Sequence, residues 1–161
     1  MLTRRSLVAS AILALPLTAL PTMRAAAATK VPVAGQARVR KLGWLPWTDG
    51  VIGTTGRSLP MEAFRLRHRT PIRCRAYMGG VGWQPWVTAD EPDTYCGFFG
   101  GRIEAVQMTL DPTWADAGYQ VQYRAHVQNV GWMDWVTGGA TSGKPGKGLR
   151  LEALRVRLIR P

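Results

Sequence analysis

The chain has 161 residues, with 21 Lys and Arg against 10 Asp and Glu and a formal net charge of +11. This length predicts one compact domain, and a hydrophobic content of 46% excludes a disordered tail. The 18 glycines and 11 prolines favour short strands joined by turns over a helical bundle. Two His, two Cys and few carboxylates leave little material for a metal centre or a paired-carboxylate active site, so the composition favours a binding protein over an enzyme.

Residues 1–28 are predicted to be a cleaved export signal. A start containing Arg4-Arg5 is followed by an apolar stretch at 7–20, which is too short for a transmembrane span, and by an A-x-A cleavage site at 26–28. The arginine pair resembles a twin-arginine signal, and the Sec route is the alternative. Cleavage removes three arginines and no acid, so the rest of the chain stays basic. We expect residues 29–161 to be secreted or held at the cell surface, with no stable membrane insertion after cleavage.

The phrase Gly-Trp-x-x-Trp occurs three times after the export signal. The three copies begin at Gly43, Gly82 and Gly131 and contain six of the seven tryptophans. Ten residues before each Gly stands an aliphatic residue, and the positions between align without a gap. A second phrase containing Glu-Ala follows about twenty residues after each Gly. This self-similarity predicts three repeats in a single domain, at about 33–70, 71–118 and 119–161.

Each repeat is predicted to form strands. Val121, Tyr123 and Ala125 alternate with polar residues, a period of two with one buried face. The last segment of each repeat changes phase, at Ala153/Leu154 in repeat three, which requires a bulge or bend and splits it into two strands, giving four per repeat. One repeat cannot bury enough apolar surface alone, so the repeats must share a core. We expect an all-β, three-fold pseudo-symmetric, β-prism-like fold, with a β-trefoil as the alternative.

These phrases carry a resemblance to a known family. Gly-Trp-x-x-Trp-Val, the Gly-Thr-Thr-Gly of 53–56, the Arg-Leu-Glu-Ala-Leu of 150–154 and the segment 123–132 resemble the clostridial hydrophobic repeats with conserved Trp, or ChW repeats. The resemblance covers residues 33–159 and is weakest in repeat two, where 89–100 replaces Gly-Thr-Thr-Gly. It implies an exported or surface-attached, non-catalytic module that binds polysaccharide or protein, and it names no ligand.

The tryptophan pairs are candidate ligand-binding residues. On an extended strand, residues three apart point to opposite faces, so we expect one ring of each pair in the core and the other at the surface. An exposed indole stacks on a sugar ring, and the Glu of the second phrase would accept hydrogen bonds from sugar hydroxyls. The alternative is that each Glu pairs with neighbouring arginines or bulge amides. Asp49, Gln84 and Asn129 are further polar candidates. The candidate binding residues are Trp44, Trp47, Glu62, Trp83, Trp86, Glu104, Trp132, Asp134, Trp135 and Glu152.

Arginines alternate along the last strands of two repeats. They are Arg65 and Arg67 in repeat one and Arg155 and Arg157 in repeat three, whereas repeat two has uncharged residues there. A solvated face that blocks edge pairing is one interpretation. The other is a polysaccharide or an anionic cell-wall polymer as partner, with an attraction that salt screens. A surface protein is an alternative partner, and nucleic acid is not expected for an exported chain.

Cys74 and Cys96 both fall in repeat two. In an exported protein a loop of roughly 20 residues between two cysteines predicts a disulfide, which contributes about 3 kcal/mol in the chain-entropy model; two free thiols are the alternative. The loop with Cys96 also carries Phe98, Phe99 and acidic residues. We therefore expect repeats one and three to bind ligand and repeat two not to bind.

Catalytic motifs are incomplete. Residues 138–145 nearly spell a P-loop, but Pro145 stands where a hydroxyl is needed and a strand follows in place of a helix. His68 and His126 lie in different repeats without a hydrolase motif. We expect no catalytic residue, metal or cofactor. The sequence favours a binding module for carbohydrate or a cell-wall polymer, with a protein-interaction module second and a small cell-wall hydrolase third.

Overall fold

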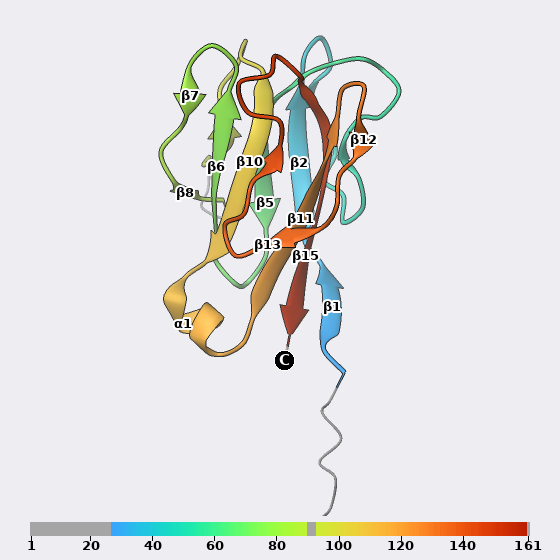
Figure 1. Ribbon diagram of the computed structural model, residues 1–161. Helices are drawn as coiled ribbons and strands as arrows, with labels where there is room; N and C mark the ends of the chain where they lie inside the picture. The colour runs from blue at the N-terminus through green and yellow to red at the C-terminus, as the bar shows by residue number, and fades with distance from the viewer. Residues whose placement is uncertain (1–26, 90–92, 161) are drawn as a thin grey trace, which may run out of the picture.

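A computed structural model describes residues 27–89 and 93–160, and it is an all-β structure (Figure 1). All but the last two residues of the expected export signal lie outside the described residues. The first strand, β1 (Thr29–Pro32), begins directly after the expected cleavage site and pairs with the last strand, β15 (Leu151–Arg160). Within the described part of the chain the one helix is α1 (Pro112–Asp116), and no helix there is long and apolar enough to cross a membrane.

The three repeats contain the same series of strands. Repeat one has β2 (Ala34–Val39), β3 (Gly43–Trp44), β4 (Ile52–Gly53) and β5 (Met61–Arg67). Repeat two has β6 (Ile72–Met78), β7 (Gly82–Trp83), β8 (Val87–Thr88), β9 (Cys96–Gly97) and β10 (Ile103–Leu110). Repeat three has β11 (Gln120–Val127), β12 (Gly131–Trp132), β13 (Val136–Thr137), β14 (Ser142–Gly143) and β15. The counterpart of β8 and β13 in repeat one is an isolated bridge between Gly35 and Thr48.

The long first strands of repeats two and three follow the predicted alternation, whereas β2 of repeat one buries Gly35, Gln36 and Ala37 in succession. In β11, Val121, Tyr123, Ala125 and Val127 are buried while the residues between them are partly exposed. β6 buries its alternate residues in the same way. A period of two with one apolar face therefore predicted these strands correctly.

The phase change in each last strand is a β-bulge, as predicted. The ladder skips one residue at Glu62, Glu104 and Glu152, directly before the Ala of the Glu-Ala phrase. The prediction that the bulge splits the segment into two strands is wrong, because β5, β10 and β15 each continue through it. A bulge places two residues opposite one and leaves the flanking ladder hydrogen bonds in place, so it redirects side chains without ending the strand.

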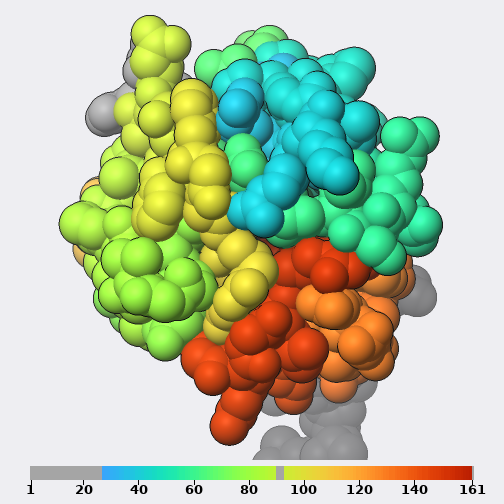
Figure 2. Space-filling view, turned by 90° about the horizontal axis from the view of Figure 1, so that it is seen from above, coloured from blue at the N-terminus to red at the C-terminus, as the bar shows by residue number. Residues whose placement is uncertain are grey.

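Each sheet receives one short strand from the following repeat. β9 of repeat two pairs with β5 of repeat one, β14 of repeat three pairs with β10 of repeat two, and β4 of repeat one pairs with β15 of repeat three. The exchange runs around the molecule and closes on itself, and Figure 2 shows the three chain segments arranged about a common centre. That the three units also superpose under a threefold rotation stays a prediction.

Each exchanged strand contains one glycine at an equivalent position. Gly53, Gly97 and Gly143 have φ of 107°, 96° and 125°, and a Cβ at each would lie 2.4 to 2.5 Å from a carbonyl oxygen of a bulged Glu. The same carbonyls accept hydrogen bonds from the residue after each glycine, at 2.9 to 3.1 Å. Both the backbone conformation and the close approach therefore require glycine.

The three sheets share one hydrophobic core. Buried residues of all three repeats, among them Phe64, Met108 and Tyr123, form a single cluster. The strands form three separate sheets around this core. The all-β class is confirmed, and the choice between a β-prism and a β-trefoil stays a prediction. Strands β2, β6 and β11 end in turns at the end of the molecule opposite the C-terminus (Figure 1).

Candidate functional site

The six paired tryptophans lie on the outer side of the sheets. All six are partly exposed, and none belongs to the buried core. The expectation that one ring of each pair joins the core is therefore wrong. The strand ends at the first Trp, so the alternation does not continue to the second. The residue after the first Trp packs inward in its place, as Leu45 and Met133 do.

Trp–Arg face one consists of Trp44, Trp47, Arg65 and Arg67. The guanidinium carbon of Arg65 lies 4.8 Å from the ring centroid of Trp44 and 5.3 Å from that of Trp47. The guanidinium carbon of Arg67 lies 4.1 Å from the centroid of Trp47. These distances are within the range of cation–π attraction, so the two rings hold the arginines over their faces.

Trp–Arg face two consists of Trp83, Trp86, Arg73 and Arg75. Arg75 lies 4.8 Å from Trp83 and 4.9 Å from Trp86, and Arg73 lies 5.9 Å from Trp86. The last strand of repeat two lacks arginines at the positions used by the other repeats, and its first strand, β6, supplies them instead. Repeat two therefore has a face of the same kind.

Trp–Arg face three consists of Trp132, Trp135, Arg124, Arg155 and Arg157. Arg124 lies 5.0 Å from Trp132 and 4.8 Å from Trp135. Arg155 lies 5.3 Å from Trp132, and Arg157 lies 3.8 Å from Trp135. Burial, and then the charges of Arg155 and Arg157, lower the pKa of Arg124. This face is the most positive of the three because it gathers three guanidinium groups.

The loop after each Trp pair extends to the sheet of the preceding repeat. Tyr95 and Phe99 of repeat two lie 5.9 and 6.1 Å from Trp44 of repeat one, and Arg38 lies 4.2 Å over Phe99. The expectation that this bulky loop obstructs the Trp pair of repeat two rested on the wrong neighbour, because strand exchange places the loop beside face one. The bulk of Phe99 therefore lies beside face one, while two acidic residues of this loop, at 90 and 91, lie outside the described residues. The expectation that repeat two does not bind ligand stays a prediction.

Glu62 and Glu104 are buried and paired. The carboxylate of Glu62 lies 3.2 Å from Nε of Arg38 and of Arg40. The carboxylate of Glu104 accepts from Arg102 at 2.6 Å and from the backbone N–H of Gly146, in the loop of repeat three, at 2.9 Å. The alternative interpretation, pairing with arginines and amides, is confirmed for both, and their carboxylates are engaged inside the fold.

Glu152 has the same role in repeat three. Its carboxylate accepts from Arg150 at 2.8 Å, and Nδ1 of His126 lies 3.2 Å away without hydrogen-bond geometry. His126 also packs edge-on against Trp132, with the ring centroids 5.3 Å apart. Glu152 therefore supports the strand beneath face three, while the face itself presents arginines.

The remaining polar candidates are scattered. Asp49 and Asp134 are exposed. The side-chain amide of Gln84 donates to the carbonyl of Gly82 at 3.3 Å, and Asn129 occupies a left-handed turn conformation with φ of 61°. Of these candidates, Asp49 lies beside the tryptophan of another repeat, because it lines a hollow with Trp135. Among the described residues, no group of three or more His, Cys, Asp or Glu is placed to hold a metal ion.

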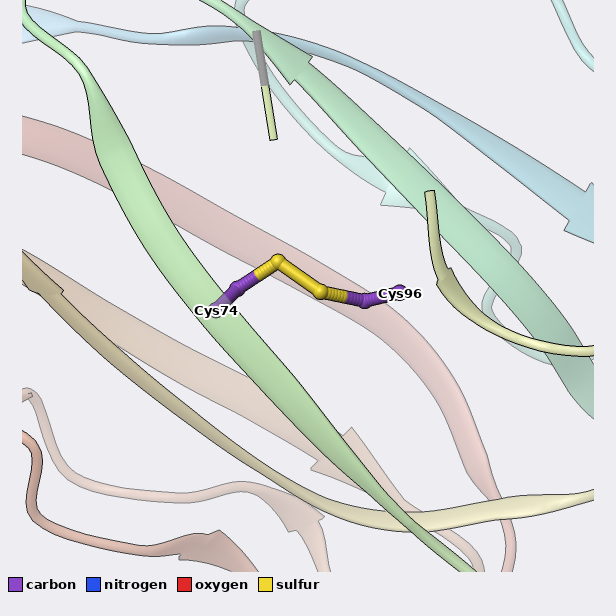
Figure 3. Close-up of a disulfide and its surroundings, with 2 residues drawn as sticks. All are labelled: Cys74 and Cys96. Atoms are coloured by element: carbon purple, nitrogen blue, oxygen red, sulfur yellow. A yellow bond between two sulfur atoms is a disulfide. The ribbon is translucent and has the colours of Figure 1, made fainter. Parts of the chain in front are cut away.

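Cys74 and Cys96 form a disulfide, as predicted (Figure 3). Both belong to repeat two in the sequence, but β9 carries Cys96 onto the sheet of repeat one. The bond therefore joins two sheets. Its two Cα atoms are 6.5 Å apart, and both cysteines are buried.

Arg73, Arg75 and Arg124 were not predicted from the sequence, because only the last strands were searched for arginines. The signal was present in the cross-strand pairs. In repeat one the glutamine, Gln36, lies on the first strand and pairs with Arg65 on the last. In repeat two the arginine, Arg75, lies on the first strand and pairs with Gln107 on the last. Recognising this requires the register, which the sequence alone does not give.

Two segments of the chain match a known family. The family model ChW, described as Clostridial hydrophobic W, matches residues 39–68 and 126–160. These two segments of the chain are similar to ChW repeats. The two matched segments contain the tryptophans of faces one and three. Residues 71–118 lie outside them, so the assignment of repeat two as a further copy depends on the sequence alignment and on the equivalent strand pairing. Comparison with curated proteins and with solved structures gives no significant match.

Proposed function

We propose that this protein is an exported, non-catalytic binding module for a polysaccharide or anionic cell-wall polymer. The observation that carries the proposal is that each repeat presents two partly exposed tryptophans holding at least one arginine guanidinium. Guanidinium groups donate in a planar fork that suits phosphate, sulfate and carboxylate groups. The indole edges beside them offer apolar contact to a sugar ring.

The number of faces favours a polymer over a small ligand. A chain of repeating units can engage two or three faces at once, and the second contact is then intramolecular, so avidity exceeds the affinity of one face. Cleavage of residues 1–28 lowers the net charge from +11 to +8, which still attracts an anionic polymer from a distance at low salt.

Export is part of the proposal. The first strand begins at Thr29, the residue after the expected cleavage site, so cleavage there leaves every described strand intact. A disulfide suits an oxidising compartment outside the cytoplasm. Identification of the N-terminal residue of protein recovered outside the cell tests this step, with Thr29 as the expected result.

A protein partner is the second candidate. Leu42, Val81 and Val130 occupy equivalent turns and are 40%, 65% and 50% exposed. Exposed aliphatic side chains at one end of a molecule favour contact with another protein. Substitution of Val81 by Asp should abolish capture of a protein partner in this case, and should leave polymer binding unchanged if the first proposal holds.

Binding to isolated cell walls at two salt concentrations tests the main proposal. We expect salt-sensitive binding that Trp47→Ala, Trp86→Ala or Trp135→Ala each weakens. Trp114→Ala, in α1 and outside the three faces, is the matched control, and thermal unfolding of each variant verifies the fold. Binding that no face variant weakens, or no binding to any wall or glycan, would contradict the proposal.

A further inference from the structure

The cross-strand pair at the centre of each Trp–Arg face differs in repeat three. In repeats one and two the pair joins an arginine to a glutamine, with Nε of Arg65 donating to Gln36 at 2.7 Å and Nε of Arg75 donating to Gln107 at 2.7 Å. In repeat three the same position pairs Arg124 with Arg155. Like charges directly opposite each other destabilise a sheet, so a local reason is needed for this pair.

The guanidinium groups of face three form no ion pair with a described residue. No carboxylate of the described residues lies within 4.0 Å of a side-chain nitrogen of Arg124, Arg155 or Arg157. Nε of Arg124 is buried and has no hydrogen-bond partner, whereas Nε of Arg157 donates to Gln122 at 3.0 Å. An unpartnered donor on a charged group is costly, and an anion would satisfy it.

A hollow lies beside these arginines. Its volume is about 290 Å³, and Trp135, Arg155 and Arg157 line it together with Asp49 and Gly50 of the loop from repeat one. Asp49 is exposed, and it is the one carboxylate among the described lining residues. The hollow gives an anionic group on an extended ligand access to Arg155 and Arg157. Arg124 does not line the hollow, but it lies opposite Arg155 in the sheet and over the same Trp132 ring. Asp49 is placed to accept a hydrogen bond from a hydroxyl on the same ligand.

We propose that Arg124 and Arg155 together bind one anionic group, a phosphate, sulfate or carboxylate, and that repeat three is thereby the charge-specific site of the protein. The proposal deepens the proposed function and rests on it for the polymeric nature of the ligand. Two guanidinium groups supply several N–H donors to one anion, and the tryptophan rings limit the movement of both side chains. Arg157, fixed by Gln122, adds charge at the rim.

The test uses substitutions that the chain already tolerates elsewhere. Arg124→Gln recreates the Gln–Arg pair of repeat one, and Arg155→Gln recreates the Arg–Gln pair of repeat two, so at least one of them is expected to fold. Arg57→Gln removes the same charge from an exposed residue outside the faces and is the matched control.

Inorganic phosphate titrated into the purified protein, followed by NMR of the arginine Nε–H groups, is the first measurement. We expect saturable shifts at Arg124 and Arg155 and at least a tenfold loss of affinity in Arg124→Gln or Arg155→Gln, since each removes a charged donor. Arg57→Gln should bind as the parent does. Unchanged phosphate affinity in both folded variants would overturn the proposal.

Oligomers of glycerol phosphate and of galacturonic acid then distinguish a phosphate from a carboxylate source, with a neutral glucan oligomer as the uncharged comparison. We expect Arg124→Gln to weaken binding of one acidic oligomer about tenfold or more and to leave the neutral one unaffected. If cell walls bind but Arg124→Gln retains full affinity for every oligomer and for phosphate, this inference is wrong and the proposed function stands. If phosphate binds at Arg124 but no wall or glycan does, the proposed function is wrong and the anion site stands.

Discussion

Repeats two and three use different chemistry at the same inner contact, where the first long strand meets the exchanged short strand. In repeat two the contact is the Cys74–Cys96 disulfide. In repeat three the aligned residues are Tyr123 and Ser142, whose hydroxyls bond to the carbonyl of Ala140 and the N–H of Ala125. The backbone arrangement that the repeats share therefore determines where the two strands meet. The side chains at that place form a disulfide in repeat two and hydrogen bonds in repeat three.

The outer faces of the same repeats differ in whether the central arginine has a hydrogen-bond partner. In repeat two Nε of Arg75 donates a hydrogen bond to Gln107, which in turn donates to Thr141 at 2.9 Å. Repeat three opposes Arg124 to Arg155 with no such partner. Repeat two therefore has a disulfide in its interior and a hydrogen-bonded arginine on its outer face. Repeat three has hydrogen bonds in its interior and an arginine without a hydrogen-bond partner at Nε on its outer face. Equivalent positions of the two repeats therefore differ in how their polar groups are satisfied.

The largest expected effect breaks what the repeats share. Gly143→Ala places a Cβ 2.4 Å from the carbonyl oxygen of Glu104 at a φ of 125°, and we expect it to cost about 4 kcal/mol of folding free energy or to prevent folding. The control is Gly139→Ala, where a Cβ meets nothing within 4 Å, at about 1 to 2 kcal/mol for the φ of 80°. Urea unfolding measures both. Equal costs would contradict the close approach between the exchanged strand and the bulge.

Removal of the disulfide tests the covalent inner contact. Cys74→Ala with Cys96→Ala should lower the free energy of unfolding by about 3 kcal/mol, because the unfolded chain regains the entropy of the open loop. Thermal unfolding of the parent with and without reductant should show a similar loss, and the double variant should not respond to reductant. A parent whose melting temperature ignores reductant would contradict this prediction.

The hydrogen-bonded inner contact is expected to contribute less. Tyr123→Phe leaves the carbonyl of Ala140 without this donor, and we expect a loss of about 1 to 2 kcal/mol at pH 8, measured by urea unfolding. The difference between Tyr123→Phe and the double cysteine variant gives the relative strength of the two inner contacts.

Alkaline pH provides a second measurement of the same contact. Burial raises the pKa of Tyr123 to about 12 from 10.0. The folded state holds this proton more tightly than the unfolded state, so the stability it contributes is complete below pH 10 and is lost as the pH rises through 12. At pH 11 the parent should have lost about 1 kcal/mol through this group, and Tyr123→Phe should not share that loss. An unchanged gap between parent and variant from pH 8 to pH 11 would show that Tyr123 titrates normally.

The smallest expected effect sharpens the comparison of the outer faces. Arg124→Gln should stabilise the fold by about 0.5 to 1 kcal/mol at low salt, because it removes a pair of opposed like charges, and salt should reduce the gain. Gln107→Arg in repeat two is the reciprocal change and should destabilise the fold. Thermal unfolding at two salt concentrations measures both, and a destabilised Arg124→Gln at low salt would show that Arg124 is satisfied within the fold.

Much of the fold was predictable because it depends on local patterns. The alternation around Tyr123 predicted a long strand, the shared phase change predicted a bulge, and the pairing of Cys74 with Cys96 followed from their number and the expected export. The placement of the Trp pairs was not predictable in the same way. The rule of opposite faces requires a continuing strand, and the strand at Trp44 stops there, so both rings lie outside with Arg65 between them.

The sequence by itself determined the number of phrases, the all-β class, the bulge, the bonded cysteines and the likeness of two segments to ChW repeats, because each depends on residue types at fixed spacings. Only the tertiary structure decided which repeat neighbours which loop and which arginine meets which tryptophan. Strand exchange places Phe99 beside Trp44 and Asp49 beside Trp135, and the register sets Arg124 against Arg155. These contacts join residues far apart in the chain, and their partners are selected by the closure of three sheets around one core, which no local spacing encodes.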